Sequence, residues 1–235
     1  MHGPRRTHRL GNVLVVDLTA PQQNLVVERG SVLPRASLIV TTAARLVMEH
    51  SKAGEKVEHL VVVGSTEDPL LHPDFREVTE NLKALRDKWY PRAKLCVFTN
   101  CRDLGSGQLR QTLGVYDKLF LDFEWGTAKT FSTITGEKST LLAELTRQLA
   151  GLNHLIVQAH FFRGEADNSS EAEVKSWIKK LHEVRPQEVH IFTEPRKIPG
   201  KSTKAITKTR QKEIVDAVAE SGFFVALHPE EPLVV

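Results

Sequence analysis

Short runs of consecutive apolar residues alternate along the chain with longer stretches in which apolar residues recur every three or four positions. The runs are typical of strands covered on both faces, as in a parallel sheet, and the stretches are typical of amphipathic helices. The predicted strands are Val13–Leu18, Leu60–Gly64, Leu95–Thr99, Lys118–Asp122, Leu155–Gln158, Glu188–Phe192 and Phe223–Leu227. The predicted helices are Ser37–His50, Asp74–Lys88, Leu104–Leu113, Ser139–Ala150, Ala172–Val184 and Thr207–Ser221. This alternation indicates right-handed βαβ units, arranged in an open sheet or in a barrel.

Polar residues stand at the C-terminal end of every predicted strand. They are Asp17; Ser65, Thr66 and Glu67; Thr99 and Asn100; Asp122 and Glu124; Gln158 and His160; Thr193 and Glu194; and His228. In parallel α/β folds these strand ends gather on one face, where ligand sites form. At a single strand the simpler interpretation is the start of a solvated loop, but the repetition along the whole chain favours a ligand site.

The side chains at these strand ends suit hydrogen bonding and charge pairing. Glu67 can hold an ammonium group, and Asn100 and Gln158 can bind amides or hydroxyls. Asp122 or Glu124 can bind a ribose. The carboxylates are too scattered along the sequence to indicate a metal site.

His160 is a candidate general base at the end of its predicted strand. A histidine in that position more often has a structural role, and no nucleophile is paired with it in the sequence. We therefore treat catalysis by His160 as the weaker of the two interpretations.

The composition is that of an ordinary soluble globular protein, because 40% of the 235 residues are hydrophobic and 26% are charged. This length can bury the core of one large α/β domain and no linker divides it, so we expect a single domain over residues 1–235. No apolar run approaches the roughly 18 residues that span a membrane, and the start MHGPRRTHRLGN lacks the apolar core of a signal peptide. We expect a cytoplasmic protein with no membrane partner.

Five segments, in order along the chain, resemble radical S-adenosylmethionine (radical SAM) enzymes. VVVGSTEDPLLHPDFREVTENLKALRDKW and KLCVFTNC are similar to the second and third βα units of that family, where G-[GST]-[GT]-E-P-L-L-H-P-D precedes a strand ending in T-N-G. YDKLFLDFEWGTAKTFSTITGE resembles its fourth strand, and the segment from IVQAHFF to PRKIPG its fifth and sixth units. The start GPRRTHRLGNVLVVDL resembles the branch related to wyosine synthesis on tRNA. The resemblance implies an incomplete parallel (β/α) barrel of the TIM-barrel type.

By this resemblance, the turn after the second strand holds the cofactor of the family. Ser65, Thr66 and Glu67 match the family motif for the amino group of the methionine part of S-adenosylmethionine. Together with the strand-end residues, the predicted cofactor-binding set is Ser65, Thr66, Glu67, Asn100, Asp122 and Gln158.

The same family needs a [4Fe–4S] cluster held by three cysteines spaced CxxxCxxC in the loop after the first strand. Here that loop reads TAPQQNLVVERGS and places Pro21, Leu25 and Glu28 at the cysteine positions, and none of them replaces a thiolate. The chain has two cysteines, Cys96 and Cys101. Cys96 fits a small buried apolar residue, and Cys101 stands where the family commonly has glycine. No [4Fe–4S] cluster is expected.

Two segments are basic, RRTHR near the start and PRKIPGKSTKAITKTRQK later in the chain. Their cations are Arg5, Arg6, Arg9, Arg196, Lys197, Lys201, Lys204, Lys208, Arg210 and Lys212. One interpretation is a phosphate-binding surface, for tRNA if the substrate class of the wyosine-related enzymes persists. An ordinary solvated face is the favoured interpretation, because no aromatic residues interleave to stack on bases and the net charge is only +3.

The sequence thus predicts a radical-SAM-like protein that has lost radical catalysis and serves as a binding or regulatory module. Its expected partner is S-adenosylmethionine, another small adenosyl ligand or a partner protein. A rival hypothesis is an active enzyme, with a cluster supplied by a partner or with cluster-independent chemistry at Glu67, Asp122 and His160. A third is an RNA-binding module, which would show steep salt dependence of tRNA affinity. Fold does not fix function, so the three stay open.

Overall fold

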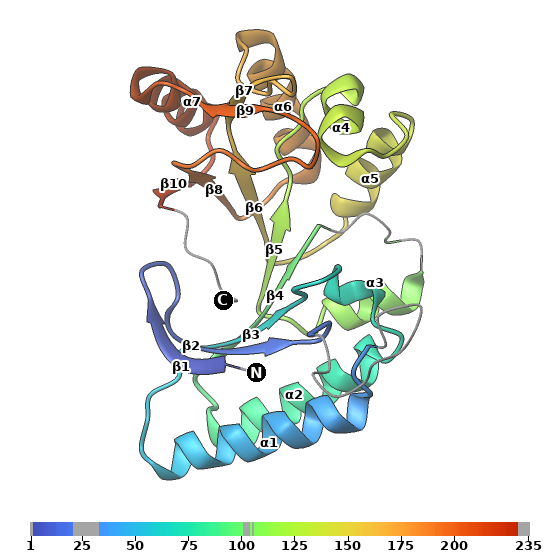
Figure 1. The fold of residues 1–235 in the computed structure, drawn as a ribbon, viewed down its shortest axis with the longest axis vertical. Coiled ribbons are helices and arrows are strands. Elements are labelled where there is room, and N and C mark those ends of the chain that lie inside the picture. The colour runs from blue at the N-terminus through green and yellow to red at the C-terminus, as the bar shows by residue number, and fades with distance from the viewer. Residues whose placement is uncertain (1, 21–32, 101–103, 105, 230–235) are drawn as a thin grey trace. The chain divides into compact units, whose positions relative to one another are not determined.

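The computed structural model describes residues 2–20, 33–100, 104 and 106–229 (Figure 1). Its strands are β1 (His2–Thr7), β2 (Gly11–Asp17), β3 (His59–Val63), β4 (Lys94–Thr99), β5 (Lys118–Asp122), β6 (Leu155–His160), β7 (Phe162–Gly164), β8 (Glu188–Phe192), β9 (Thr203–Ala205) and β10 (Val225–His228). Its helices are α1 (Ala36–Lys52), the 3₁₀ helix η1 (Pro69–Leu71), α2 (Phe75–Trp89), α3 (Gly107–Leu113), α4 (Ala128–Thr135), α5 (Leu141–Leu149), α6 (Glu171–Val184) and α7 (Lys208–Glu220).

Eight strands form one sheet in the order β1-β2-β3-β4-β5-β6-β8-β10, and β7 and β9 form a separate two-stranded ribbon. The pairs β2–β3, β3–β4, β6–β8 and β8–β10 are parallel, and β1 is antiparallel to β2. The prediction of a parallel α/β fold is confirmed.

Every predicted strand and helix is present, with ends displaced by at most three residues. Four further elements, β1, β7, β9 and α4, have few apolar residues and were not predicted from the sequence. β1 has the sequence HGPRRT and is held by backbone pairing with β2, from His2 opposite Val15 to Thr7 opposite Gly11. An edge strand of this kind needs no apolar side chain, so hydrophobic periodicity cannot detect it.

The described chain divides into two compact units. The N-terminal unit takes in the described residues up to Leu119 except Leu104, and the C-terminal unit takes in Leu104 and Phe120 onward. β5 begins in one unit and ends in the other. Our expectation of a single domain stays a prediction.

In the N-terminal unit, α1 and α2 lie side by side against one face of the strands (Figure 1). Leu14 and Leu60 are partners in the β2–β3 register, and Leu60 and Leu95 are partners in β3–β4. All three are buried. The same register places the C-terminal ends of β2, β3 and β4 next to one another.

In the C-terminal unit, the last register row of β6, β8 and β10 contains His160, Phe192 and His228. α6 begins at the cap Ser170, whose Oγ accepts a hydrogen bond from the backbone N–H of Glu173 at 3.3 Å. Trp177 of α6 is buried and donates its indole N–H to the Phe123 carbonyl at 2.8 Å.

No helix in the described ranges is long and apolar enough to cross a membrane.

Candidate functional site

The carboxylate of Asp17 organises the C-terminal end of β2. Asp17 is the last residue of β2 and is buried. Its Oδ1 accepts hydrogen bonds from the backbone N–H of Thr19 at 3.0 Å and of Ser65 at 3.1 Å. Ser65 follows β3, so one buried carboxylate joins the ends of two neighbouring strands. These donors compensate for the water that the carboxylate loses on burial.

Thr19 fixes the turn that follows β3. Its Oγ1 accepts a hydrogen bond from the N–H of Thr66 at 3.1 Å, and the Thr66 hydroxyl donates to the Thr19 carbonyl at 2.8 Å. Gly64 lets the turn close tightly, because a β-carbon there would lie 2.0 Å from the Glu67 carbonyl oxygen. The turn therefore has little room for an alternative conformation.

Asp68 connects this turn to β4. Its carboxylate accepts hydrogen bonds from the Thr99 hydroxyl at 2.8 Å and from the backbone N–H of Asn100 at 2.6 Å. It also caps η1 by accepting from the N–H of Leu70 at 2.9 Å. Asp68 carries no assigned role in the sequence analysis, because its contacts depend on the pairing of β3 with β4.

The structure thus brings Ser65, Thr66 and Glu67 together in one turn, with the backbone of Asn100 joined to it through Asp68. The Glu67 side chain is half-buried. Within the described part of the chain, no residue donates a hydrogen bond to its carboxylate or forms an ion pair with it. Hydrogen bonds within the described chain fix the backbone of this turn, and the Glu67 carboxylate takes part in none of them. Binding of an ammonium group there stays a prediction.

In the C-terminal unit, Asp122 and Gln158 lie together and bind each other. Gln158 Nε2 donates to Asp122 Oδ1 at 3.2 Å, and a guanidinium nitrogen of Arg196 lies 3.0 Å from Oδ2. Arg196 comes from the segment between β8 and β9, which the sequence analysis assigned to a basic surface. A ligand hydroxyl at Asp122 would have to replace one of these contacts. The prediction of a ribose-binding role is untested.

Glu124 is the most deeply buried carboxylate of this unit, with 1% of its surface exposed. Its Oε1 lies 2.6 Å from Arg196 Nε, and its Oε2 accepts from the backbone N–H of His160 at 2.9 Å. Burial raises the pKa of Glu124 to about 7, the Arg196 guanidinium opposes that rise, and the Asp122 carboxylate adds to it. One arginine therefore contacts both carboxylates and offsets one negative charge.

His160 has the contacts of a structural histidine. It is buried, and its ring stacks on Phe192 with centroids 4.5 Å apart and planes 8° apart. Its Nδ1 lies 3.0 Å from the Glu194 carbonyl oxygen. Because a carbonyl only accepts, the neutral ring carries its proton on Nδ1. A role as general base stays a prediction.

Asn168 is a site residue that the sequence did not indicate. It is fully buried, and its Nδ2 donates to the carbonyls of Glu124 at 2.9 Å and His160 at 2.8 Å. Its Oδ1 accepts from the N–H of Phe162 at 2.9 Å. Asn168 therefore ties the chain after β5 to the end of β6.

The cysteines do not provide the donor set of a [4Fe–4S] cluster. Three thiolates are required in radical SAM enzymes, and the whole chain contains two cysteines. Cys96 is fully buried on β4, as predicted, and burial raises the pKa of its thiol to about 12. Cys101 and the loop positions Pro21, Leu25 and Glu28 lie outside the described residues. Within the ranges given above, no three His, Cys, Asp or Glu side chains gather as metal ligands.

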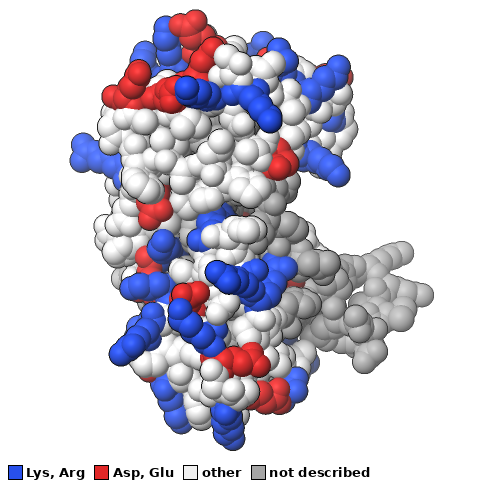
Figure 2. All heavy atoms as spheres, turned by 90° about the vertical axis from the view of Figure 1, so that its left-hand side faces the viewer, with Lys and Arg blue, Asp and Glu red and all other residues white. Residues whose placement is uncertain are grey.

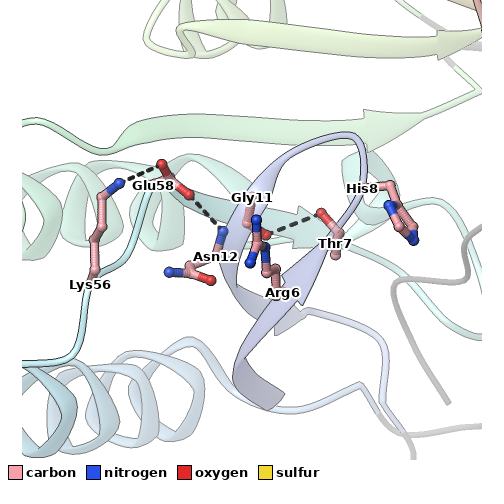
Figure 3. Close-up of a pocket in the computed structure, with 7 residues that line it drawn as sticks. All are labelled: Arg6, Thr7, His8, Gly11, Asn12, Lys56 and Glu58. Carbon is pink, nitrogen blue, oxygen red and sulfur yellow. Dashed lines mark hydrogen bonds and ion pairs between the residues drawn. The ribbon is translucent and has the colours of Figure 1, made fainter.

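A polar groove lies at the opposite end of β2 from Asp17 (Figure 3). It is lined by Arg6, Thr7, His8, Gly11, Asn12, Lys56 and Glu58. The Glu58 carboxylate pairs with Lys56 Nζ at 2.8 Å and accepts from the N–H of Asn12 at 2.9 Å. Lys56 therefore neutralises the Glu58 carboxylate within the groove. The lining residues form a polar surface and indicate no specific reaction.

Basic and acidic side chains are interspersed over the face shown in Figure 2. Within the later basic segment, Arg210 pairs with Glu213 at 2.8 Å, and Arg196 pairs with the two strand-end carboxylates. Some cations of this segment are therefore paired with acids, and others form no ion pair within the described residues.

No protein-family model matches the chain. Among curated proteins, the chain is similar to the GTPase Obg of Brachyspira hyodysenteriae, with 22% identity over 222 residues. The match covers 87% of this chain, and this chain spans 31% of the length of that protein.

The one tripeptide that resembles a nucleotide-binding loop does not have the required context. Gly200, Lys201 and Ser202 match the end of GxxxxGK[ST], but the first position of that motif is Pro195. Ser202 is followed by β9, whereas a phosphate-binding loop leads into a helix. The local structure gives no support to GTP binding by this chain.

Several solved structures share the fold. SuiB of Streptococcus suis bound to S-adenosylmethionine has a TM-score of 0.64 at 11% identity, and the match covers 94% of this chain and 51% of that one. A domain of the pyruvate-formate lyase-activating enzyme of Bacteroides vulgatus has a TM-score of 0.56 at 14% identity, covering 73% and 99% of the two chains. A radical SAM methyltransferase of Sphaerobacter thermophilus has a TM-score of 0.56 at 12% identity, covering 85% and 59%. The chain has the fold of radical SAM enzymes.

Proposed function

We propose that this protein is a radical-SAM-like relative without a cluster of its own, and that it serves as a non-catalytic, regulatory binding module for S-adenosylmethionine or a related adenosyl ligand. The observation that carries the proposal is the turn after β3. Asp17 and Thr19 fix this turn, and the Glu67 carboxylate on it makes no bond within the described chain. A carboxylate carried on a fixed backbone turn suits an ammonium group, because the backbone loses little conformational entropy on binding.

The donor chemistry argues for the non-catalytic part of the proposal. A chain with two cysteines, of which one is buried with its pKa raised to about 12, cannot supply three thiolates. The retained turn and the lost donor set together favour ligand binding without radical chemistry. We include in the proposal that the chain is a member of the wyosine-related branch, on the basis of the opening motif GPRRTHRLGN.

The test is a titration of the full chain with S-adenosylmethionine, followed by thermal shift and calorimetry. A ligand that binds only the folded state raises the melting temperature. Glu67→Gln should weaken binding by about tenfold or more, because a charge-assisted hydrogen bond contributes about 1.5–3 kcal/mol. 5′-Methylthioadenosine lacks the ammonium group, so its affinity should be the same in both proteins.

Glu220→Gln is the matched control, since Glu220 is exposed at the end of α7. If saturating S-adenosylmethionine gives no thermal shift, the proposal fails. If Glu67→Gln binds like wild type, the assigned role of the carboxylate is wrong. Anaerobic reconstitution with iron and sulfide should give no charge-transfer absorption. A brown protein that forms 5′-deoxyadenosine would support the active-enzyme hypothesis instead.

A further inference from the structure

The short ribbon of β7 and β9 presents two like charges directly opposite each other. Its cross-strand partners are Phe162 and Ala205, Arg163 and Lys204, and Gly164 and Thr203. Arg163 and Lys204 are both exposed. Like charges at facing positions of an antiparallel pair destabilise it, so this arrangement is unfavourable without an anion nearby.

On the other face of the ribbon, Phe162 is buried. Phe162 packs in a small apolar cluster with Ala166 and Ile198, against which Ile134 also packs. Because successive side chains of a strand point to opposite faces, Arg163 points away from this cluster and toward solvent. The ribbon is therefore anchored on one face by Phe162 and presents Arg163 and Lys204 on the other.

Further cations flank the ribbon. Ile198 and Lys201 form a bridge around Pro199 and Gly200, with the Lys201 N–H donating to the Ile198 carbonyl at 3.1 Å and Gly200 at φ +72°. This is the arrangement of a type II turn, and it holds Lys201 beside the start of β9. Lys197 stands on the other side of the same turn.

On the far side of β9, Lys208 opens α7, and the first turn of that helix contains no acidic residue. A cation at a helix N-terminus is unfavourable, because it meets the positive end of the helix dipole.

We name Arg163, Lys197, Lys201, Lys204 and Lys208 the ribbon cations. All five are exposed, and none forms an ion pair with any residue in the described ranges. The nearest acid in sequence, Glu165, uses its carboxylate to accept from the Ser202 N–H at 3.0 Å. Arg196 and Arg210 are excluded from the set because they pair with acids. A cluster of five exposed cations that form no ion pair in the described ranges indicates an anionic partner.

We propose that the ribbon cations bind the phosphodiester backbone of double-stranded nucleic acid. Residues 163–167 and 197–212 contain no aromatic side chain, so the surface cannot stack on the bases of a single strand. It also lacks the large exposed apolar side chains that anchor a protein in a lipid surface. Lysine and arginine without base-reading partners give phosphate contacts that do not depend on sequence.

The test compares wild type with the double variant Arg163→Ser, Lys204→Ser. The probes are a fluorescent 20-base-pair RNA duplex and a DNA duplex of the same sequence, titrated between 50 and 200 mM salt. The slope of log affinity against log salt should decrease by about 2 in the variant, because each phosphate contact contributes about 0.9. The affinity near 100 mM salt should fall by about tenfold or more. Equal effects on the two duplexes are expected of a backbone contact.

Lys52→Ser, Arg92→Ser is the matched control, because both side chains are exposed and unpaired within the described chain. This control should bind like wild type. Circular dichroism melts of each variant separate a loss of binding from a loss of folding. The proposal is overturned if wild type binds neither duplex, if the two double variants bind alike, or if anionic vesicles or polyglutamate bind while the duplexes do not. It does not depend on S-adenosylmethionine binding.

Discussion

The strand ends of the two units carry carboxylates in different electrostatic states. In the N-terminal unit, Asp17 and Asp68 accept hydrogen bonds from backbone N–H groups. The Glu67 carboxylate forms no hydrogen bond or ion pair within the described chain. In the C-terminal unit, Asp122 and Glu124 are both paired with Arg196. A polar residue at a strand end is therefore a poor guide to ligand binding by itself. What distinguishes the candidates is whether the fold already uses the group.

The largest effect that bears on this comparison should come from the N-terminal turn. In Gly64→Ala the added β-carbon would lie 2.0 Å from the Glu67 carbonyl oxygen, so the turn must move. We expect a loss of about 3 kcal/mol or more in the free energy of unfolding, measured by urea denaturation.

Gly107→Ala is the control for this change, since a β-carbon there meets no atom within 4 Å. It should leave stability unchanged or raise it slightly, because Gly107 lies in α3. Equal stabilities of the two variants would show that the turn is not tightly packed.

The second-largest effect concerns Glu124 in the C-terminal unit, where we expect the free energy of unfolding to depend on pH. Because burial raises the pKa of Glu124 from 4.5 to about 7, the folded state keeps a proton that the unfolded state loses between these values. The stability contributed by protonated Glu124 is therefore complete below pH 4.5 and is lost as the pH rises through 7. Relative to Glu124→Gln, the wild-type free energy of unfolding should fall by about 2–3 kcal/mol over this range.

Denaturation curves at several pH values measure this difference. Glu220→Gln, which removes an exposed carboxylate, should follow the wild-type pH dependence. If the free energies of unfolding of wild type and Glu124→Gln vary in parallel with pH, burial does not raise the pKa of Glu124 in the folded protein.

The smallest effect should come from Asp17→Ala, which removes the acceptor of the Thr19 and Ser65 N–H groups. Leaving buried donors without an acceptor should cost about 2 kcal/mol. Asp216→Ala on α7 is exposed and should change stability by less than about 0.5 kcal/mol. A loss below that limit in Asp17→Ala would mean that water replaces the carboxylate and that the turn is held by its other contacts.

Much of the fold follows from the sequence because the strands are runs such as Leu60–Val63, whose burial on both faces leaves one interpretation open. The elements that the sequence did not predict, such as β1 and the β7–β9 ribbon, are short or polar and are held by backbone pairing. No local pattern of side chains specifies that pairing.

The candidate site could be predicted as a set of residue types but not as a network. The motif at Ser65, Thr66 and Glu67 identified the turn, whereas the bond from Thr99 to Asp68 depends on which strands are neighbours. Arg196 illustrates the same difficulty, because it stands in a basic segment and its partners lie on a distant strand end. The sequence identifies the charged residues, but the fold determines which of them are paired with an opposite charge.

Arg196 has an effect that extends beyond its own contacts. Its carbonyl accepts a hydrogen bond from the Thr203 hydroxyl at the first residue of β9, so the residue that pairs with two carboxylates is also attached to the ribbon. The guanidinium offsets one negative charge of this pair of acids. Its removal would make the charge of the unit more negative by one, and the diffusional attraction of a polyanion toward the ribbon cations would weaken although none of them had been altered.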